Sequence, residues 1–322
     1  MALLLTEQDV QGLLTMSLAL ETVEQAFRDL ADGTFILHGR RRIHMPNKGF
    51  LHYMAAADFI GGYAGLKIYT YAAGALRFLV PLFRWDSGEL VALIEANFMG
   101  QVRTGAASGV ATKFMARNDA RTVGLIGTGT QAPTQVEAVC AVRLIERVRV
   151  FGRNPERRQQ FARRLAQKVA CTVEPVDSAE QAVREADVVL TATTAGHPVV
   201  ESSWLKPGVH INAVGNNQAQ KRELDEQTVR RAGVIATDSL EQARMEAGEL
   251  IQVFGADAGS WSRVVDLAQI VVGAAVGRHS PGELTLFKSN GVAIEDIAVG
   301  GRVYELARER GIGREVPLFA GP

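Results

Sequence analysis

A glycine-rich segment at residues 123–132, VGLIGTGTQA, has residue types and spacing suited to holding a phosphate group. Gly127, Gly129 and Ala132 follow the pattern G-x-G-x-x-A, between an apolar run and a segment expected to be helical from about Pro133. The first glycine permits a tight turn, the second lets the backbone approach a pyrophosphate, and the small third residue allows close packing of helix on strand. The helix N-terminus adds free N–H groups and a positive dipole end. Ordinary strand-to-helix turns share this pattern, so the elements around it must support a dinucleotide site.

Arginines follow the next expected strand, in the segment VFGRNPERR at residues 150–158. About 20 residues after such a turn, NAD-specific sites place a carboxylate that accepts from the ribose 2′-hydroxyl. This chain has Gly152 and Arg153 there, and a guanidinium binds a 2′-phosphate by charge-assisted hydrogen bonds. The segment therefore predicts that NADP(H) is preferred over NAD(H). The residues expected to bind the nucleotide are Gly127, Thr128, Gly129, Thr130, Gln131, Arg153, Asn154 and Arg157, and Arg158 is expected on a solvated helix face.

Strand and helix patterns alternate after a small-residue helix at residues 104–118. This alternation is typical of a parallel sheet with helices on both faces. Together with the glycine turn it predicts an α/β fold, a Rossmann-type doubly wound parallel sheet at residues 117–300. The expected strands are residues 122–126, 147–151, 171–176, 187–193, 209–214 and 233–238. Residues 260–275 and 290–311 are expected to be helical, with 277–289 as their connection.

The first hundred residues lack this alternation and predict a separate α+β domain for substrate binding and dimerisation. Residues 17–30 carry Leu20, Val23, Phe27 and Leu30 at helical spacing. Short strands follow, with turns at 46–49 and 61–62 and a hairpin turn at 86–88. The domain is expected to span residues 1–116, with a C-terminal helix at about 301–322 packing back onto it.

Composition limits the classes of partner and site. The chain has 322 residues, 47% of them apolar, and its 35 basic residues balance 35 acidic ones, which disfavours nucleic acid or an anionic membrane as a partner. Two cysteines, Cys140 and Cys171, fit reduced thiols and a cytoplasmic location better than a disulfide framework. His197, His210 and His279 lack metal-like spacing, so no metal site is expected.

The whole set of motifs resembles the ornithine cyclodeaminase and mu-crystallin family, which includes archaeal alanine dehydrogenases and ketimine reductases. The segments that carry the resemblance are GLKIYT around Lys67, VRTGAASGVATKFMAR from Arg103, VGLIGTGTQA, ADVVLTATTAGHPVV, GVHINAVGNN, RELD at 222–225 and LFKSNGVAIEDIAVGGRVYELARERGIG. The resemblance covers almost the whole chain. It implies a homodimer whose first domain supplies the dimer interface and the substrate groups, with the active site in the cleft against the nucleotide-binding domain.

The resemblance also implies roles for individual residues. Lys67 matches the family's substrate lysine, and Arg41 matches the arginine that grips the substrate carboxylate, with Arg42 as an alternative within the run of arginines. Arg103 and Thr104 match a pair near substrate and cofactor. Both basic groups are chemically apt, since a forked guanidinium suits a carboxylate and a buried lysine in apolar surroundings either meets an anion or has its pKa lowered for proton transfer. Without the resemblance, a strand lysine that extends its ammonium group to solvent is an equally good interpretation. Residues at positions that line the nucleotide in the family are Thr193, Val214, Gly215, Lys221 and Ser289.

Two departures from the cyclodeaminase pattern favour a reductase. Asn217 stands where ornithine cyclodeaminases have an acid/base aspartate, and His52 stands where they have a glutamate for the distal amine. Asparagine orients an imine nitrogen or a water but exchanges no proton at neutral pH. Reduction of an already protonated imine chiefly needs hydride geometry and carboxylate binding. The expected activity is therefore hydride transfer to the C=N carbon of a small 2-imino acid of the ketimine or pyrroline-2-carboxylate type.

Two alternatives stay open at this point. One is an ornithine cyclodeaminase or an alanine-type amino-acid dehydrogenase that uses water or a nearby acid such as Asp225. The other is a crystallin-like protein that binds nucleotide and a small ligand without turnover.

Overall fold

The computed structural model describes residues 1–318 and divides into two compact units. Unit 1 comprises Met1–Arg103 with Gly291–Pro322, and unit 2 comprises Thr104–Asn290. The expected boundaries at 116 and 300 differ from these, because most of helix α3 (Asn97–Met115) packs within unit 2 and helix α12 (Ala293–Arg310) lies entirely in unit 1. Residues 319–322 of the expected C-terminal segment lie outside the described residues.

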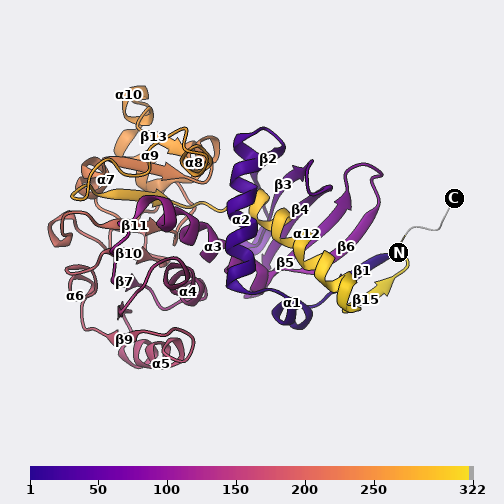
Figure 1. The fold of residues 1–322 in the computed structure, drawn as a ribbon, viewed down its shortest axis with the longest axis horizontal. Helices are drawn as coiled ribbons and strands as arrows, with labels where there is room; N and C mark the ends of the chain where they lie inside the picture. The colour runs from indigo at the N-terminus through magenta and orange to yellow at the C-terminus, as the bar shows by residue number, and fades with distance from the viewer. Residues whose placement is uncertain (319–322) are drawn as a thin grey trace. The chain divides into compact units, whose positions relative to one another are not determined.

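Unit 1 is built on a seven-stranded sheet with helix α12 packed against β3 and β4 and against α2 (Figure 1). Neighbouring strands are antiparallel, except that β1 and β6 are parallel. The sheet order is β15 (Arg314–Val316), β1 (Ala2–Leu5), β6 (Leu90–Glu95), β5 (Ala75–Arg84), β4 (Tyr63–Ala72), β3 (Phe50–Asp58), β2 (Phe35–His44). The remaining elements are α1 (Glu7–Leu13), α2 (Met16–Ala31) and the 3-10 turn η1 (Pro46–Lys48).

Local sequence explains where helix α2 begins and where helix α12 ends. Thr15 caps α2 by accepting a hydrogen bond from the backbone N–H of Leu18, and the helix buries Val23 and Phe27 as its apolar spacing predicts. Helix α12 ends at Gly311, whose φ of 65° is the left-handed conformation that glycine adopts most easily. Its first turn contains two acidic residues that are fully buried, which needs charged partners nearby.

Unit 2 is an eight-stranded parallel sheet, as the Rossmann-type prediction requires (Figure 1). Val189 packs in one apolar cluster while Val188 and Leu190 pack in another, so both faces of the sheet are covered. Cys140 and Cys171 are free thiols packed against the second cluster. The sheet order is β13 (Val264–Asp266), β12 (Val234–Thr237), β14 (Thr285–Lys288), β11 (His210–Ala213), β10 (Val188–Thr191), β7 (Thr122–Ile126), β8 (Arg147–Phe151), β9 (Thr172–Pro175).

Two strands of this sheet correct the sequence expectation. All six expected strands are present, but β14 lies between β11 and β12 in a segment expected to be a connection. The helix expected at 260–275 is instead α10 (Ala258–Trp261), β13 and α11 (Leu267–Val271). A buried strand of three or four residues is too short to show an alternating pattern, so only its neighbours in the sheet define it.

The helices of unit 2 connect the strands. They are α4 (Ala132–Val142), α5 (Pro155–Leu165), α6 (Ala179–Val183), α7 (Glu226–Arg231), α8 (Leu240–Glu246) and α9 (Gly248–Phe254), with a 3-10 turn η2 at Ser202–Trp204. Within residues 1–318, no helix has the length and apolar character needed to cross a membrane.

Candidate functional site

The turn after β7 has the geometry that its glycines predict. Gly127 has a φ of 112°, and a Cβ atom there would lie 2.3 Å from the carbonyl oxygen of Ala192. The turn therefore excludes a side chain both by conformation and by close approach to the loop after β10. Around Gly129 a Cβ atom would meet only the same carbonyl oxygen, at 4.0 Å, so its backbone lies open.

Helix α4, which follows this turn, begins without a side-chain cap. Gln131 occupies the N-cap position and makes no capping hydrogen bond, whereas Asn154, Ser178, Asp225 and Ser239 cap helices α5 to α8. The uncapped N–H groups and the open glycine backbone suit a pyrophosphate. The residues present thus fit the nucleotide cofactor that the fold implies.

The arginines after β8 divide into two kinds. Arg153 and Arg157 are exposed, beside the N-terminus of α5. The expectation for Arg158 is wrong, because this side chain is only 6% exposed and donates hydrogen bonds to the carbonyl oxygen of Gly152 and to Asp177. Arg158 holds the loop in place, while the other two guanidinium groups are available to an anion.

Three further nucleotide positions expected from the sequence lie at the carboxyl ends of β10 and β11. Thr193, Val214 and Gly215 sit where those strands end, and Glu223 ties their loops together. The Glu223 carboxylate accepts from Thr191 Oγ1 at 2.9 Å, Thr193 N at 2.8 Å, Thr193 Oγ1 at 2.7 Å and Gly215 N at 2.8 Å. The sequence analysis missed Glu223, although it belongs to the RELD segment noted there.

The other expected site residues of unit 2 lie in segments that follow the strands at the same edge of the sheet. Ser289 is buried after β14, and its hydroxyl donates to Asp238 at 3.0 Å. Lys221 and Asn217 are half-buried in the segment after β11. Asp225 caps α7 through Thr228 N and accepts from Ser202 N, so both its oxygens hold backbone. It is poorly suited to act as a substitute acid.

A second group of charged residues lies in unit 1, on the sheet face that α12 covers. Lys67 stands opposite Met54 in the register of β3 and β4, and residues opposite each other share a face. Arg40 reaches the same place, since its guanidinium lies 3.4 Å from Met54 Sδ and donates to the Gly291 carbonyl at 3.1 Å. Arg40 takes this position because β2 has a bulge, where the register with β3 shifts between His38 and Arg41.

The expectation that Arg41 shares a site with Lys67 is not met in unit 1. Arg41 stands opposite Tyr53 and Ile68, which are on the other face of the sheet, and its side chain is exposed. Arg42, the alternative, is half-buried and shares the face of His52 and Lys67. Arg40, which the sequence analysis passed over, is 6% exposed. The bulge therefore decides which face of the sheet each of the three arginines takes.

Lys67 and Arg103 meet two buried carboxylates from the first turn of α12. Lys67 Nζ lies 2.8 Å from Asp296 Oδ1, Arg103 Nε lies 3.1 Å from the same oxygen, and Arg103 Nη1 pairs with Glu295. All four side chains are at most 6% exposed. With Arg40 the group brings three cations and two carboxylates together where burial makes charge costly. Buried guanidinium and ammonium groups of this kind suit an anionic ligand.

Burial sets the protonation of this group. Desolvation by burial lowers the pKa of Lys67 to about 8, with the charge of Arg103 adding to the effect and Asp296 opposing it. A lysine with this pKa gives up a proton readily near neutral pH. The carboxylate pair was missed in the sequence, where the signal is two acidic residues in the otherwise apolar segment GVAIEDIAVGG.

His52 lies on the same face, next to aromatic rings. Its Nδ1 is 2.9 Å from Tyr69 Oη, and its ring stacks on Phe50 with centroids 4.2 Å apart. Burial, together with Arg42 and Arg40, lowers the pKa of His52 to about 4, so the ring is neutral at neutral pH. Thr104 follows Arg103 along α3 and is buried within unit 2.

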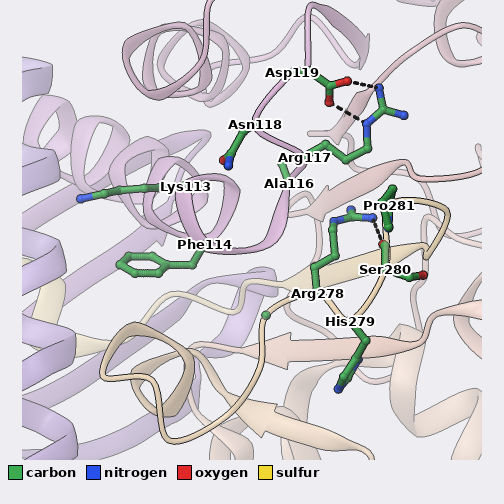
Figure 2. A pocket seen from close by; sticks show the side chains of 11 residues that line it. Lys113, Phe114, Ala116, Arg117, Asn118, Asp119, Arg278, His279, Ser280 and Pro281 are labelled. Carbon is green, nitrogen blue, oxygen red and sulfur yellow. Dashed lines mark hydrogen bonds and ion pairs between the residues drawn. The ribbon is translucent and has the colours of Figure 1, made fainter.

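A separate hollow of about 700 Å³ in unit 2 is distinct from the nucleotide positions (Figure 2). It lies at the amino ends of the strands, since its Arg117 reaches Asp187 just before β10. The arginines that line it are occupied: Arg117 pairs with Asp119, and Arg278 donates to the Ser280 carbonyl (Figure 2). Arg278 also donates to the Met115 carbonyl and to Thr285. In the described part of the chain, no group of three or more His, Cys, Asp or Glu side chains is placed to hold a metal ion.

Comparisons with known proteins find similar chains in both sequence and fold. The model of the ornithine cyclodeaminase/mu-crystallin family matches residues 1–311. A Δ1-pyrroline-2-carboxylate reductase of Bacillus cereus is 40% identical over 239 residues, which are 74% of this chain and 73% of that protein.

Two solved structures are similar over nearly the whole chain. The Δ1-pyrroline-2-carboxylate reductase of Thermococcus litoralis, in complex with NADH and L-proline, has a TM-score of 0.92 and 36% identity, and covers 98% of this chain and 100% of that one. An archaeal alanine dehydrogenase dimer with bound NAD also has a TM-score of 0.92, with 32% identity and 99% of each chain covered.

Proposed function

The chain belongs to the ornithine cyclodeaminase/mu-crystallin family, and from that premise we propose that it is an NAD(P)H-dependent reductase of small 2-imino acids. The observation that carries this proposal is the buried group of three basic side chains, Arg40, Lys67 and Arg103, with the carboxylates Glu295 and Asp296. A 2-imino acid has one carboxylate next to its C=N bond, and buried guanidinium and ammonium groups bind a carboxylate. The Bacillus and Thermococcus relatives that carry the name Δ1-pyrroline-2-carboxylate reductase support this substrate class.

The reaction adds a hydride and a proton, which together are two electrons and two protons, to the C=N bond. The reduced nicotinamide supplies hydride to the imine carbon, and the nitrogen takes up a proton, which leaves an amino acid and oxidised nucleotide. The chain's own residues bind and orient the substrate. Arg40 holds the substrate carboxylate through its planar fork.

Lys67 holds the proton at its Nζ atom. Because its pKa lies at about 8, Lys67 is charged at neutral pH but is a stronger acid than an exposed lysine. Asp296 fixes the position of the ammonium group at 2.8 Å. The proton is therefore stored beside the carboxylate clamp, in a place that excludes bulk water.

The experiment that tests the activity follows loss of the nicotinamide absorbance with purified protein and pyrroline-2-carboxylate. We expect oxidation of the reduced nucleotide and formation of proline. Ammonia release from ornithine with catalytic nucleotide would instead indicate a cyclodeaminase. Oxidation of alanine with NAD⁺ and no imine reduction would indicate an amino-acid dehydrogenase, and nucleotide binding without turnover would indicate a binding protein.

We propose further that NADPH is preferred over NADH. The exposed guanidinium groups of Arg153 and Arg157 and the absence of a carboxylate at Gly152 support this preference. Arg153→Ala is expected to raise the Michaelis constant for NADPH by about 10- to 100-fold, as loss of a charge-assisted hydrogen bond implies, with little change for NADH. Arg163→Ala, another exposed arginine of α5, is the control. Equal effects on both nucleotides would contradict a 2′-phosphate contact.

The assembly we propose is a homodimer formed through the sheet face opposite Lys67. Ile36, Ile43, Tyr53 and Leu79 are 37% to 54% exposed on strands β2 to β5, and such an apolar face favours association. The similar archaeal alanine dehydrogenase is a dimer, which supports a dimeric state. Sedimentation should give twice the chain mass, and Tyr53→Glu should shift the protein toward monomer. A wild-type monomer at micromolar concentration would refute this assembly.

A further inference from the structure

Glu223 is a buried carboxylate whose four hydrogen-bond donors come from two different loops. Its side chain is 0% exposed. Thr191 and Thr193 donate from the end of β10, and Gly215 donates from the end of β11. Each carboxylate oxygen accepts two of the four bonds. Burial and the charge of Glu249 raise the pKa of Glu223, and the hydrogen bonds from Thr193 oppose that rise. Without the Glu223 side chain, buried donors in both loops would lose their partner.

The backbone of Glu223 is tied to a second buried pair. Its N–H donates to Glu249 Oε1 at 2.9 Å, and Lys288 Nζ lies 3.5 Å from Glu249 Oε2. Lys288 in turn donates to the carbonyl oxygens of Ala213, Asn216 and Ser289, which belong to the ends of β11 and β14. All three charged side chains are fully buried. The network therefore joins the carboxyl ends of β10, β11 and β14.

The loops held by Glu223 lie next to the glycine turn. A Cβ atom on Gly127 would lie 2.3 Å from the Ala192 carbonyl, and one on Gly215 would lie 2.3 Å from the Thr193 carbonyl and 2.4 Å from Glu223 Oε1. Dinucleotides bind across the carboxyl ends of the strands, at the point where the strand order reverses. In unit 2 that point is between β7 and β10. The half that begins with β7 takes the pyrophosphate and the adenosine, which leaves the loops after β10 and β11 for the nicotinamide half.

We propose that Glu223 is the positioning residue that sets the loops after β10 and β11 for the nicotinamide half of the cofactor. This role rests on the nucleotide part of the proposed function. It does not require contact between Glu223 and the nucleotide, because the carboxylate acts through Thr193 and Gly215. Glu249 holds the backbone of Glu223 by accepting its N–H, and Lys288 pairs with Glu249.

The test compares the whole cofactor with a fragment that lacks nicotinamide. In Glu223→Gln, the amide offers one acceptor oxygen in place of two. We expect the dissociation constant of NADPH, measured by its fluorescence, to rise about tenfold and kcat to fall, as loss of a charged acceptor implies. The dissociation constant of 2′-phospho-ADP-ribose, measured by calorimetry, should stay within about twofold, because its site uses the β7 turn and the end of β8.

Controls separate positioning from folding. Asp225→Asn removes a carboxylate from the same segment that holds only backbone of α7 and Ser202, and it should change neither constant. If Glu223→Gln does not fold, judged by circular dichroism, Glu223→Asp replaces it with the same expectation. An equal loss for NADPH and the fragment, or no loss for either, would overturn the proposal. A wild type that binds NADPH but reduces no imine refutes the proposed activity alone and leaves this comparison valid.

Discussion

Lys67→Gln is expected to lower kcat for imine reduction by about 10³-fold, within the range that a positioned proton donor contributes. The variant removes the stored proton and one buried positive charge, so the Michaelis constant for the imino acid should rise as well. Asp296 keeps its contact with Arg103 at 3.1 Å, which lets the fold tolerate the change. Steady-state kinetics with pyrroline-2-carboxylate and saturating NADPH give both constants.

The pH profile of the wild type checks the same role. Lys67 is protonated below its pKa of about 8, so the reductive rate should be constant below that pH and fall as pH rises through it. In Lys67→Gln this alkaline limb, the fall in rate above the pKa of Lys67, should be absent. Lys113→Gln, an exposed lysine of unit 2, should keep both the rate and the limb. A full rate in Lys67→Gln, or an unchanged limb, would show that another group supplies the proton.

Arg40→Leu is expected to raise the Michaelis constant for the imino acid by about 10²-fold, as loss of a forked contact with a carboxylate implies. The effect on kcat should be smaller, because the clamp binds substrate and transition state alike. Arg40→Lys keeps the charge without the fork, so its Michaelis constant should lie between those of the wild type and Arg40→Leu.

Arg41→Leu is the matched control for this clamp, since it removes the neighbouring guanidinium from the opposite face of the sheet. Its Michaelis constant should stay near that of the wild type, although dimer strength can change. A larger effect for Arg41→Leu than for Arg40→Leu would place the carboxylate clamp on the other face.

Much of unit 2 follows from local sequence. The glycine spacing at 127–132 and six alternating strands define a Rossmann-type sheet, because turn conformation and strand period are local properties. Strand β14 does not follow from local sequence, since residues 285–288 become a central strand only through pairing with β11 and β12. Arg158 likewise looked like a surface residue until Asp177, 19 positions away, was placed beside it.

The sequence alone determined the family and the nucleotide turn, and it singled out Lys67 and Arg103 as candidates. Only the tertiary structure decided which face of the sheet each arginine of the run at 40–42 takes, because a one-residue bulge reverses every side chain beyond it. It also decided that Glu295 and Asp296, about 190 residues from Arg103, neutralise two of the three buried cations. Glu223 became visible in the same way, through two loops that meet only in the folded sheet. Charge balance and strand register are long-range properties, and folding alone brings their parts together.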